Sequence, residues 1–252
     1  MLRPRIIPCL LVHNKGLCKT TNFSNHKYIG DPLNAVRIFN EKNVDEIIIL
    51  DIDKTIQNEE PDYQLISDMA RECRMPLCYG GGIKSPEQVE RIISLGVEKV
   101  SLSSAAIENP GLIQECANRV GSQSIVITID IKLTGLLKKK YQVFTMNGKN
   151  LINKDFMTIV NHTISSGAGE IVINSIDREG TGKGYDKDLV NIIYPRLSIP
   201  LTVLGGASSS DDIRELIHDF GIIGAAAGSM FVLKGKYRAV LLQYPDYDEK
   251  QQ

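Results

Sequence analysis

The chain has 252 residues, of which 42% are hydrophobic and 23% are charged, and its formal net charge is −1. This length allows one large barrel or two ordinary domains, and the composition is typical of a globular protein. The balanced charge gives no indication of a nucleic-acid partner or a membrane surface, and no apolar run reaches the roughly 20 residues of a membrane span. The short apolar stretch near the N-terminus is interrupted by Pro8, so we expect no signal peptide.

Cysteine and histidine usage bears on compartment and metal binding. The five cysteines are scattered and odd in number, which indicates reduced thiols rather than a disulfide framework or a zinc site. The four histidines show no metal-ligand spacing. The sequence therefore predicts a cytoplasmic protein without a metal ion.

Eight apolar segments recur along the chain, and their β-branched residues are typical of strands buried on both faces. The first predicted strand is followed by a polar loop over residues 13–32. The fifth ends on a carboxylate, Asp130, which is either a functional group or simply the start of a loop. The predicted strands are 5–12, 46–51, 76–79, 100–103, 124–130, 170–174, 200–204 and 221–227.

Helix-start signals lie between these strands. Asp31 and Pro32 fit the N-cap and the first helical position, and residues 85–88 form a capping box. Residues 133–150 read instead as a β-hairpin, with Asn147-Gly148 as a turn signal. A last helix is predicted over 230–243, and the polar tail from Tyr244 is expected to be frayed. Other helices are predicted at 32–41, 62–73, from 86, from about 110, at 154–165, after 178–186, and at 211–220.

The alternation of strand and helix, repeated eight times, predicts a (β/α)₈ TIM barrel, with a doubly wound open sheet as the alternative. The chain also repeats itself. The segments that begin at Pro76 and Pro200 match at an offset of 124 residues, and an offset of 119 aligns the first strand with the fifth. We therefore expect a single barrel over residues 1–252, built from two half-barrels at about 1–123 and 124–240.

In both halves, a strand runs into paired glycines immediately before a helix, and a small-residue segment follows the next strand. Backbone N–H groups at such places can bind phosphate oxygens, although tight packing would also explain the glycines. Two matched copies favour two phosphate sites on opposite sides of the barrel mouth. The residues are Gly81, Gly82, Ser103 and Ser104 in one half, and Gly205, Gly206, Gly228 and Ser229 in the other.

Charged residues precede four of the predicted strands: Arg5, Glu46, Lys99 and Glu170. At the amino-end face of a barrel they can point inward as a ring of ion pairs, or they can form a solvated rim. The residues alone favour the solvated rim.

A further polar set sits at or beyond the carboxyl ends of strands, where barrel enzymes place their chemistry. Carboxylates there can act as general acids or bases, and Lys19 can hold an anionic group. His13 could also do acid–base work, but a lone loop histidine is more often simply solvated. The set is Lys19, Asp51, Asp53, Asp130, Ser175 and Asp177.

Several of these segments resemble the cyclase subunit of imidazole glycerol phosphate synthase. They are RIIPCLLV, GDPLNAVRIFNE, DEIIILDID, YGGGIKSPEQ, GSQSIVITIDIK, GAGEIVINSIDREGTGKGYD and the GGA of VLGGA. The similarity runs from Arg5 to about Val232. It implies a TIM barrel formed by half-barrel duplication, with a glutaminase subunit at the amino-end face. Ammonia from the glutaminase passes through the barrel and reacts with a bis-phosphate, phosphoribulosyl-formimino aminoimidazole carboxamide ribotide, in a lyase-type cyclisation that needs no cofactor.

Carried over by position, the resemblance favours the ion-pair ring over the solvated rim. It implies that Arg5, Glu46, Lys99 and Glu170 gate the entry of ammonia. It also implies that the two glycine and serine sets bind the two phosphates. Lys19, Asp51, Asp177 and Gly180 are further expected ligand-binding residues, with Asp130 as a catalytic aspartate.

One departure from the family pattern affects the expected activity. The family uses two aspartates for ring closure, at the ends of strands one and five, and the first position holds Leu11. Leucine cannot transfer a proton, and losing such a group typically costs about 10²–10⁴ in rate. Glu179, where the family usually has aspartate, and the opening of the loop HNKGLCKT are smaller departures.

The chain has the family's ammonia gate and phosphate segments but only one of its two catalytic aspartates. This combination resembles a branch of the family associated with surface-polysaccharide genes. Its members, with a paired glutaminase, support amidation of a sugar by a third protein, and we favour this function. The first alternative is an authentic cyclase of histidine biosynthesis, with His13 or another group replacing the missing acid. Two further alternatives are the related aminoaldose isomerase, which Leu11 disfavours, and a purely structural activator of the glutaminase.

Overall fold

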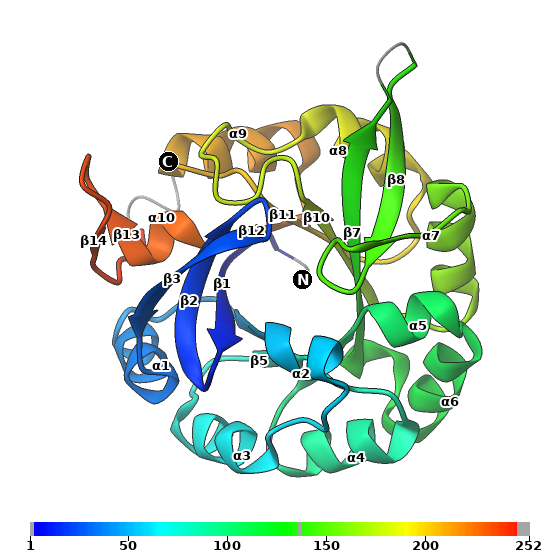
Figure 1. Ribbon diagram of the computed structural model, residues 1–252, viewed down its shortest axis with the longest axis horizontal. Coiled ribbons are helices and arrows are strands. Elements are labelled where there is room, and N and C mark those ends of the chain that lie inside the picture. The colour runs from blue at the N-terminus through cyan, green and yellow to red at the C-terminus, as the bar shows by residue number, and fades with distance from the viewer. Residues whose placement is uncertain (1–2, 136–137, 246–252) are drawn as a thin grey trace.

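Eight parallel strands pair side by side in a closed ring in the computed structural model, which describes residues 3–135 and 138–245 (Figure 1). The ring closes where the first strand pairs with the last, with Arg5 opposite Gly224. This confirms the predicted (β/α)₈ barrel and excludes the open sheet. In order around the ring, the strands are β1 (Arg5–His13), β4 (Ile47–Asp51), β5 (Leu77–Gly80), β6 (Lys99–Leu102), β7 (Ile125–Thr134), β10 (Glu170–Ser175), β11 (Leu201–Leu204) and β12 (Gly224–Ala227).

Each barrel strand is buried on both faces, because one face lines the interior and the other packs against helices. Side chains alternate between these faces with the two-residue period of a strand, so a continuous apolar run satisfies both. The inward-facing apolar side chains form a cluster separate from the main core. It contains Ile7, Cys9, Ile48, Cys78, Val126, Val172, Leu204 and Ala226.

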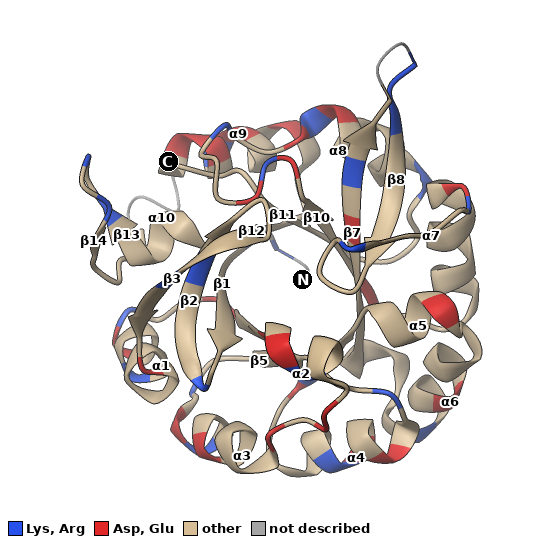
Figure 2. Cartoon of the chain, viewed as in Figure 1, with Lys and Arg blue, Asp and Glu red and all other residues tan. Residues whose placement is uncertain are grey.

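The outer layer consists of helices, which carry much of the surface charge (Figure 2). The Asp31 and Asp62 side chains cap α1 and α3, and Ser85 and Gln88 form the predicted capping box at α4. The helices are α1 (Pro32–Glu41), α2 (Ile52–Gln57), α3 (Tyr63–Glu72), α4 (Pro86–Ser94), α5 (Ser104–Glu108), α6 (Gly111–Val120), α7 (Phe156–Ser165), α8 (Lys187–Ile193), α9 (Ser210–Phe220) and α10 (Ser229–Val232), with 3₁₀ turns at Ser122–Ser124 and Tyr194–Arg196.

Hairpins project over the carboxyl-end face. The segment predicted as a polar loop over 13–32 instead forms strands β2 (Gly16–Thr21) and β3 (Ser24–Gly30). Two pairs of residues with positive φ make its tight turns, Asn14-Lys15 and Asn22-Phe23. The β-hairpin predicted after β7 is present as β8 (Lys140–Thr145) and β9 (Asn150–Leu151), with Asn147 and Gly148 at positive φ.

The prediction of a long last helix is wrong. Helix α10 ends at Val232, and a short hairpin follows, β13 (Leu233–Lys234) with β14 (Ala239–Val240). Gly235, at φ 72°, allows the chain to turn there.

The start of the tail is not frayed, because Tyr244 is buried. Its hydroxyl donates to the Ile6 carbonyl at 2.8 Å and accepts from the Asp45 amide at 3.2 Å.

Within the described residues, no helix is long and apolar enough to cross a membrane.

We expect Tyr244→Phe to lower the free energy of unfolding by about 1–2 kcal/mol, because it removes a buried hydroxyl that bonds to β1 and to the residue before Glu46. Urea denaturation monitored by circular dichroism measures this change. Tyr237→Phe is the matched control, because the Tyr237 side chain is 88% exposed. Equal stabilities for the two variants would contradict a stabilising role for the tail.

Candidate functional site

The four charged residues that precede barrel strands meet inside the amino end of the barrel. Arg5 forms ion pairs with Glu46 and, at 2.6 Å, with Glu170, and Lys99 Nζ lies 2.9 Å from both carboxylates. Only 3% of Glu46 and 5% of Glu170 is exposed. The four residues therefore form an ion-pair ring with buried carboxylates and half-buried basic groups, and the solvated rim that the residues alone favoured is wrong.

The charges within this ion-pair ring stabilise one another. Burial alone would raise the pKa of Glu170, but the hydrogen bond from Arg5 and the charges of Arg5 and Lys99 bring that pKa below its ordinary value. Burial opposes the charge on Lys99, and the two carboxylates outweigh it, so the pKa of Lys99 is raised. The Lys99 ammonium and the Glu170 carboxylate are therefore both held in their charged forms.

Thr202 is a fifth member of the ring that sequence reasoning missed. Its hydroxyl donates to Glu170 Oε1 at 2.6 Å, and its oxygen lies 3.3 Å from Arg5 Nη2. The neighbouring β12 makes room for it with Gly224, where a Cβ atom would collide with the Thr202 hydroxyl. The alternation of side chains along β11 is a signal that could have placed Thr202 inside the barrel.

Above the ion-pair ring, the barrel interior is mostly apolar. The exception is one hydroxyl pair on neighbouring strands, Ser101 and Thr128, whose oxygens lie 2.7 Å apart and are buried. Because Lys99 and Ser101 are two residues apart on β6, the interior wall leads directly from the ring toward the carboxyl end.

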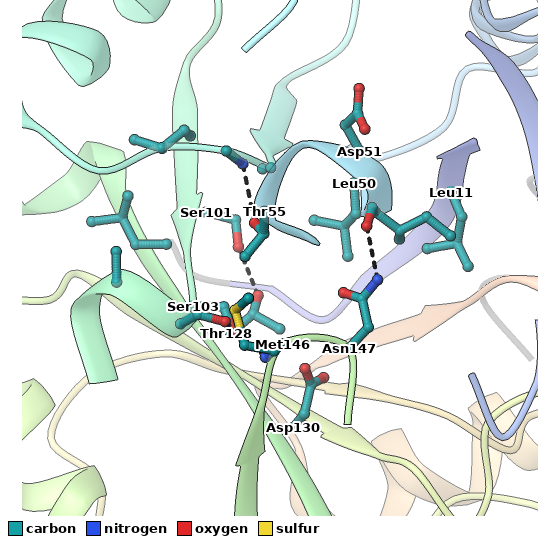
Figure 3. Close-up of a pocket in the computed structure, with 18 of the residues that line it drawn as sticks. Leu11, Leu50, Asp51, Thr55, Ser101, Ser103, Thr128, Asp130, Met146 and Asn147 are labelled. Carbon is teal, nitrogen blue, oxygen red and sulfur yellow. Dashed lines mark hydrogen bonds between the residues drawn. The ribbon is translucent and has the colours of Figure 1, made fainter. Parts of the chain in front are cut away.

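Two pockets lie at the carboxyl end of the barrel, and Figure 3 shows the larger one. The larger has a volume of about 340 Å³ and the smaller about 40 Å³. The larger pocket contains the predicted residues Leu11, Asp51, Gly81, Gly82, Ser103, Ser104 and Asp130. The smaller contains Lys19, Gly180, Gly205, Gly206, Gly228 and Ser229. Four residues border both pockets: Leu11, Phe23, Leu50 and Asn174.

Asp130 lies in the larger pocket, where its carboxylate accepts a hydrogen bond from Asn174 Nδ2 at 2.9 Å. Burial raises the pKa of Asp130 to about 7, Asn174 opposes this, and the charge of Glu179 adds to it. Leu11 approaches the same pocket from β1 (Figure 3) and brings no titratable group. The pocket therefore holds one carboxyl group suited to proton transfer near neutral pH, without the expected second aspartate.

Lys19 is buried beside the smaller pocket, with only 4% of its surface exposed. Its ammonium donates to the Cys9 carbonyl at 2.7 Å, and a Cβ atom at Gly228 would collide with it. Its hydrogen bond to a neutral carbonyl leaves the positive charge of this buried ammonium well placed to bind an anion.

Other predicted polar residues have structural partners. The Asp51 side chain caps α2 by accepting from two backbone amides, and burial raises its pKa. Ser104 Oγ accepts from the Met146 amide at 3.0 Å. Asp177 does not border either pocket, since its carboxylate accepts from the Leu133 amide at 2.7 Å.

His13 also points away from the pockets, with its Nδ1 2.7 Å from Asp53 Oδ1. It stacks on His26, which does border the larger pocket and which sequence reasoning missed. Phe23 was missed too, because its place at a hairpin turn over the mouth depends on strands that were predicted as loop. Glu179 binds this hairpin through Thr20 Oγ1 at 3.0 Å and the Phe23 amide at 3.2 Å.

The described residues contain no cluster of three or more His, Cys, Asp or Glu side chains that could hold a metal ion. The pockets instead offer hydroxyls, backbone amides, the buried Lys19 ammonium and several carboxyl groups, among them Asp130.

Comparison with known proteins finds that residues 5–238 match the family described as histidine biosynthesis protein. The “Putative imidazole glycerol phosphate synthase subunit hisF3” of Vibrio vulnificus is 55% identical over 99% of this chain and 96% of that protein. A hisF2 subunit with the same description in Pseudomonas aeruginosa is 47% identical over 99% of this chain and 98% of that protein. The imidazole glycerol phosphate synthase subunit HisF of Streptococcus mutans is 35% identical, over 92% and 91%.

The raised pKa of Asp130 predicts that the stability of the fold depends on pH. The folded protein binds the Asp130 proton more tightly than the unfolded chain does. Proton binding at Asp130 therefore stabilises the fold fully below about pH 4, and this stabilisation is lost as the pH rises through about 7. We expect the free energy of unfolding of Asp130→Asn to be close to that of the parent near pH 4 and to exceed it by about 4 kcal/mol near pH 8.5.

Urea denaturation at the two pH values measures this difference. Glu115→Gln makes the same carboxyl-to-amide change at an exposed position of α6 and serves as the control. An Asp130→Asn difference that is the same at both pH values would contradict the raised pKa.

Proposed function

Because this chain belongs to the family of imidazole glycerol phosphate synthase cyclase subunits, we propose that it carries ammonia from a glutaminase to a phosphorylated acceptor. The ammonia enters through the ion-pair ring, crosses the apolar interior and emerges between the two pockets. The observation that carries this proposal is the alignment of a buried ring, an apolar interior and a two-part mouth along one barrel axis.

The ion-pair ring has the chemistry of a selective entrance. A surface rim would gain only about 0–1 kcal/mol from each pair, whereas buried charges need their partners to remain ionised. Neutral ammonia can cross the apolar interior, while the ammonium ion would lose its hydration there. A glutaminase docked over Arg5 and Lys99 would deliver ammonia at a point sheltered from water.

The two pockets support a ligand with a phosphate at each end. The Gly81, Gly82, Ser103 and Ser104 set borders the larger pocket, and the Gly205, Gly206, Gly228 and Ser229 set borders the smaller. Lys19 adds a buried positive charge on the second side. Gly180 contributes to this second site, whereas Asp177 acts through the backbone of β7.

Leu11 favours a role in sugar amidation over imidazole formation. Ring closure in the family is a two-carboxylate reaction, and here Asp130 faces an alkyl side chain. We therefore propose that the chain supports a third protein, which amidates a sugar with the ammonia delivered at the mouth. The phosphate-binding pockets are in this view a site for a phosphorylated sugar.

The second candidate is an authentic cyclase of histidine biosynthesis. In that reaction ammonia and the bis-phosphate give imidazole glycerol phosphate and an aminoimidazole carboxamide ribotide. The observation that favours it is the pKa of Asp130, which burial raises to about 7, because a general acid–base group works best near the ambient pH. His13 is not the replacement acid, because it pairs with Asp53 outside both pockets.

Restoring the second carboxylate distinguishes the two candidates. We expect Leu11→Asp to raise turnover of the bis-phosphate with ammonium salts by about 10²-fold or more, because it supplies the missing proton-transfer group. Formation of the imidazole product, followed by absorbance and chromatography, measures this change. Leu11→Asn is the control, since it adds similar polarity without a group that can transfer a proton. If the parent chain turns over the bis-phosphate and Leu11→Asp does not increase that turnover, the proposal is contradicted.

The proposed role of the ion-pair ring as the ammonia entrance is tested with the glutaminase in complex with the chain. We expect Arg5→Ala to release glutamine-derived ammonia to solvent while docking persists, because the ring loses its contacts to Glu46 and Glu170. Arg3→Ala is the matched control on the same face, since the Arg3 side chain is exposed and pairs with Asp45, which is not part of the ion-pair ring. The measurement is the fraction of ammonia that reaches the acceptor, and equal fractions for the two variants would favour a purely structural activator.

A further inference from the structure

Asn174 occupies the boundary between the two pockets. It is the third inward-facing residue of β10, after Glu170 in the ion-pair ring and Val172 in the interior, and only 5% of it is exposed. It borders both pockets. Its side chain therefore connects the two halves of the mouth.

The orientation of the Asn174 amide follows from its neighbour. The nitrogen Nδ2 lies 2.9 Å from Asp130 Oδ1 and donates to it. The reversed amide would place two acceptor oxygens against each other whenever Asp130 is ionised. The nitrogen thus faces the larger pocket, and the oxygen Oδ1 is directed away from Asp130.

Asn174 Oδ1 is a buried acceptor that no donor among the described residues reaches. It lies 3.3 Å from the position where a Cβ atom of Gly205 would stand, so it is directed at the smaller pocket. Ser229 Oγ in the same pocket is likewise buried without a described partner. Leaving a buried acceptor unpaired is unfavourable, so both groups point to a polar ligand.

The chemistry of these groups assigns different parts of that ligand to each. The Ser229 hydroxyl and the Lys19 ammonium are donors and suit phosphate oxygens. The Asn174 oxygen is an acceptor, and it would repel a phosphate dianion. Its partner must be a donor carried by the carbon chain that adjoins the phosphate, and in a phosphorylated sugar or polyol that donor is a hydroxyl group.

We propose that Asn174 Oδ1 accepts a hydrogen bond from a ligand hydroxyl next to the phosphate in the smaller pocket, and that it selects phosphorylated polyols over their deoxy analogues. This inference rests on the proposed function, since it takes the smaller pocket as the phosphate site. A site built to pair with a hydroxyl discriminates against the ligand that lacks it, because the buried acceptor is then left unpaired.

Three phosphate probes test the proposal by isothermal titration calorimetry at about pH 8, where phosphate monoesters are mainly dianions. The probes are sn-glycerol 3-phosphate, propyl phosphate of the same chain length, and inorganic phosphate. We expect the parent chain to bind glycerol phosphate about tenfold more tightly than propyl phosphate, as one hydrogen bond to a buried acceptor implies. In Asn174→Leu the ratio of the two affinities should fall to about one.

Asn34→Leu makes the same substitution at an exposed position of α1 and should keep the parent ratio. Circular dichroism and thermal unfolding show whether each variant is folded, and Asn174→Thr, which keeps an acceptor oxygen, provides a second variant with an intermediate ratio. A ratio of about one in the parent, or a parent-like ratio in folded Asn174→Leu, would overturn the inference alone. Failure of all three probes to bind the parent would overturn the proposed phosphate site and the inference with it.

Discussion

The pairing of two buried carboxylates with two half-buried basic side chains at one end of the barrel is the constraint on which the rest of the structure depends. Arg5, Glu46, Lys99 and Glu170 come from four different parts of the chain, and each basic group pairs with both carboxylates. Removing one partner of a buried pair typically costs about 3–5 kcal/mol. The ring therefore fixes the registers of β1, β4, β6 and β10 relative to one another, and those registers determine which side chains reach the mouth.

The two ends of the barrel are linked through single strands. On β10, Glu170 belongs to the ion-pair ring, Val172 to the apolar interior and Asn174 to the mouth. Lys99 at the start of β6 belongs to the ion-pair ring, and Ser103, the first residue after this strand, borders the larger pocket. Because side chains alternate along a strand, three inward-facing residues spaced two apart reach the entrance, the interior and the binding surface of the barrel.

The sequence was enough to predict the eight strands, the barrel and the two glycine and serine sets that border the pockets, because apolar periodicity and glycine pairs are local signals. Without the family resemblance, the residues were not enough to decide between ring and rim, since burial of Glu46 depends on side chains far along the chain. The β2–β3 hairpin was missed because its polar residues lack apolar alternation. Thr202 and Asn174 were missed because their roles depend on neighbours across strands, Glu170 and Asp130.

The contact between Tyr244 and β1 has a consequence for synthesis of the protein. Within the barrel ring the first strand lies between β4 and β12, and β12 is more than 200 residues further along the chain. The hydroxyl that binds the Ile6 carbonyl comes later still. On the ribosome, β1 therefore keeps an unpaired edge until β12 has been synthesised, and closing this seam is a long-range step that delays folding of the whole barrel.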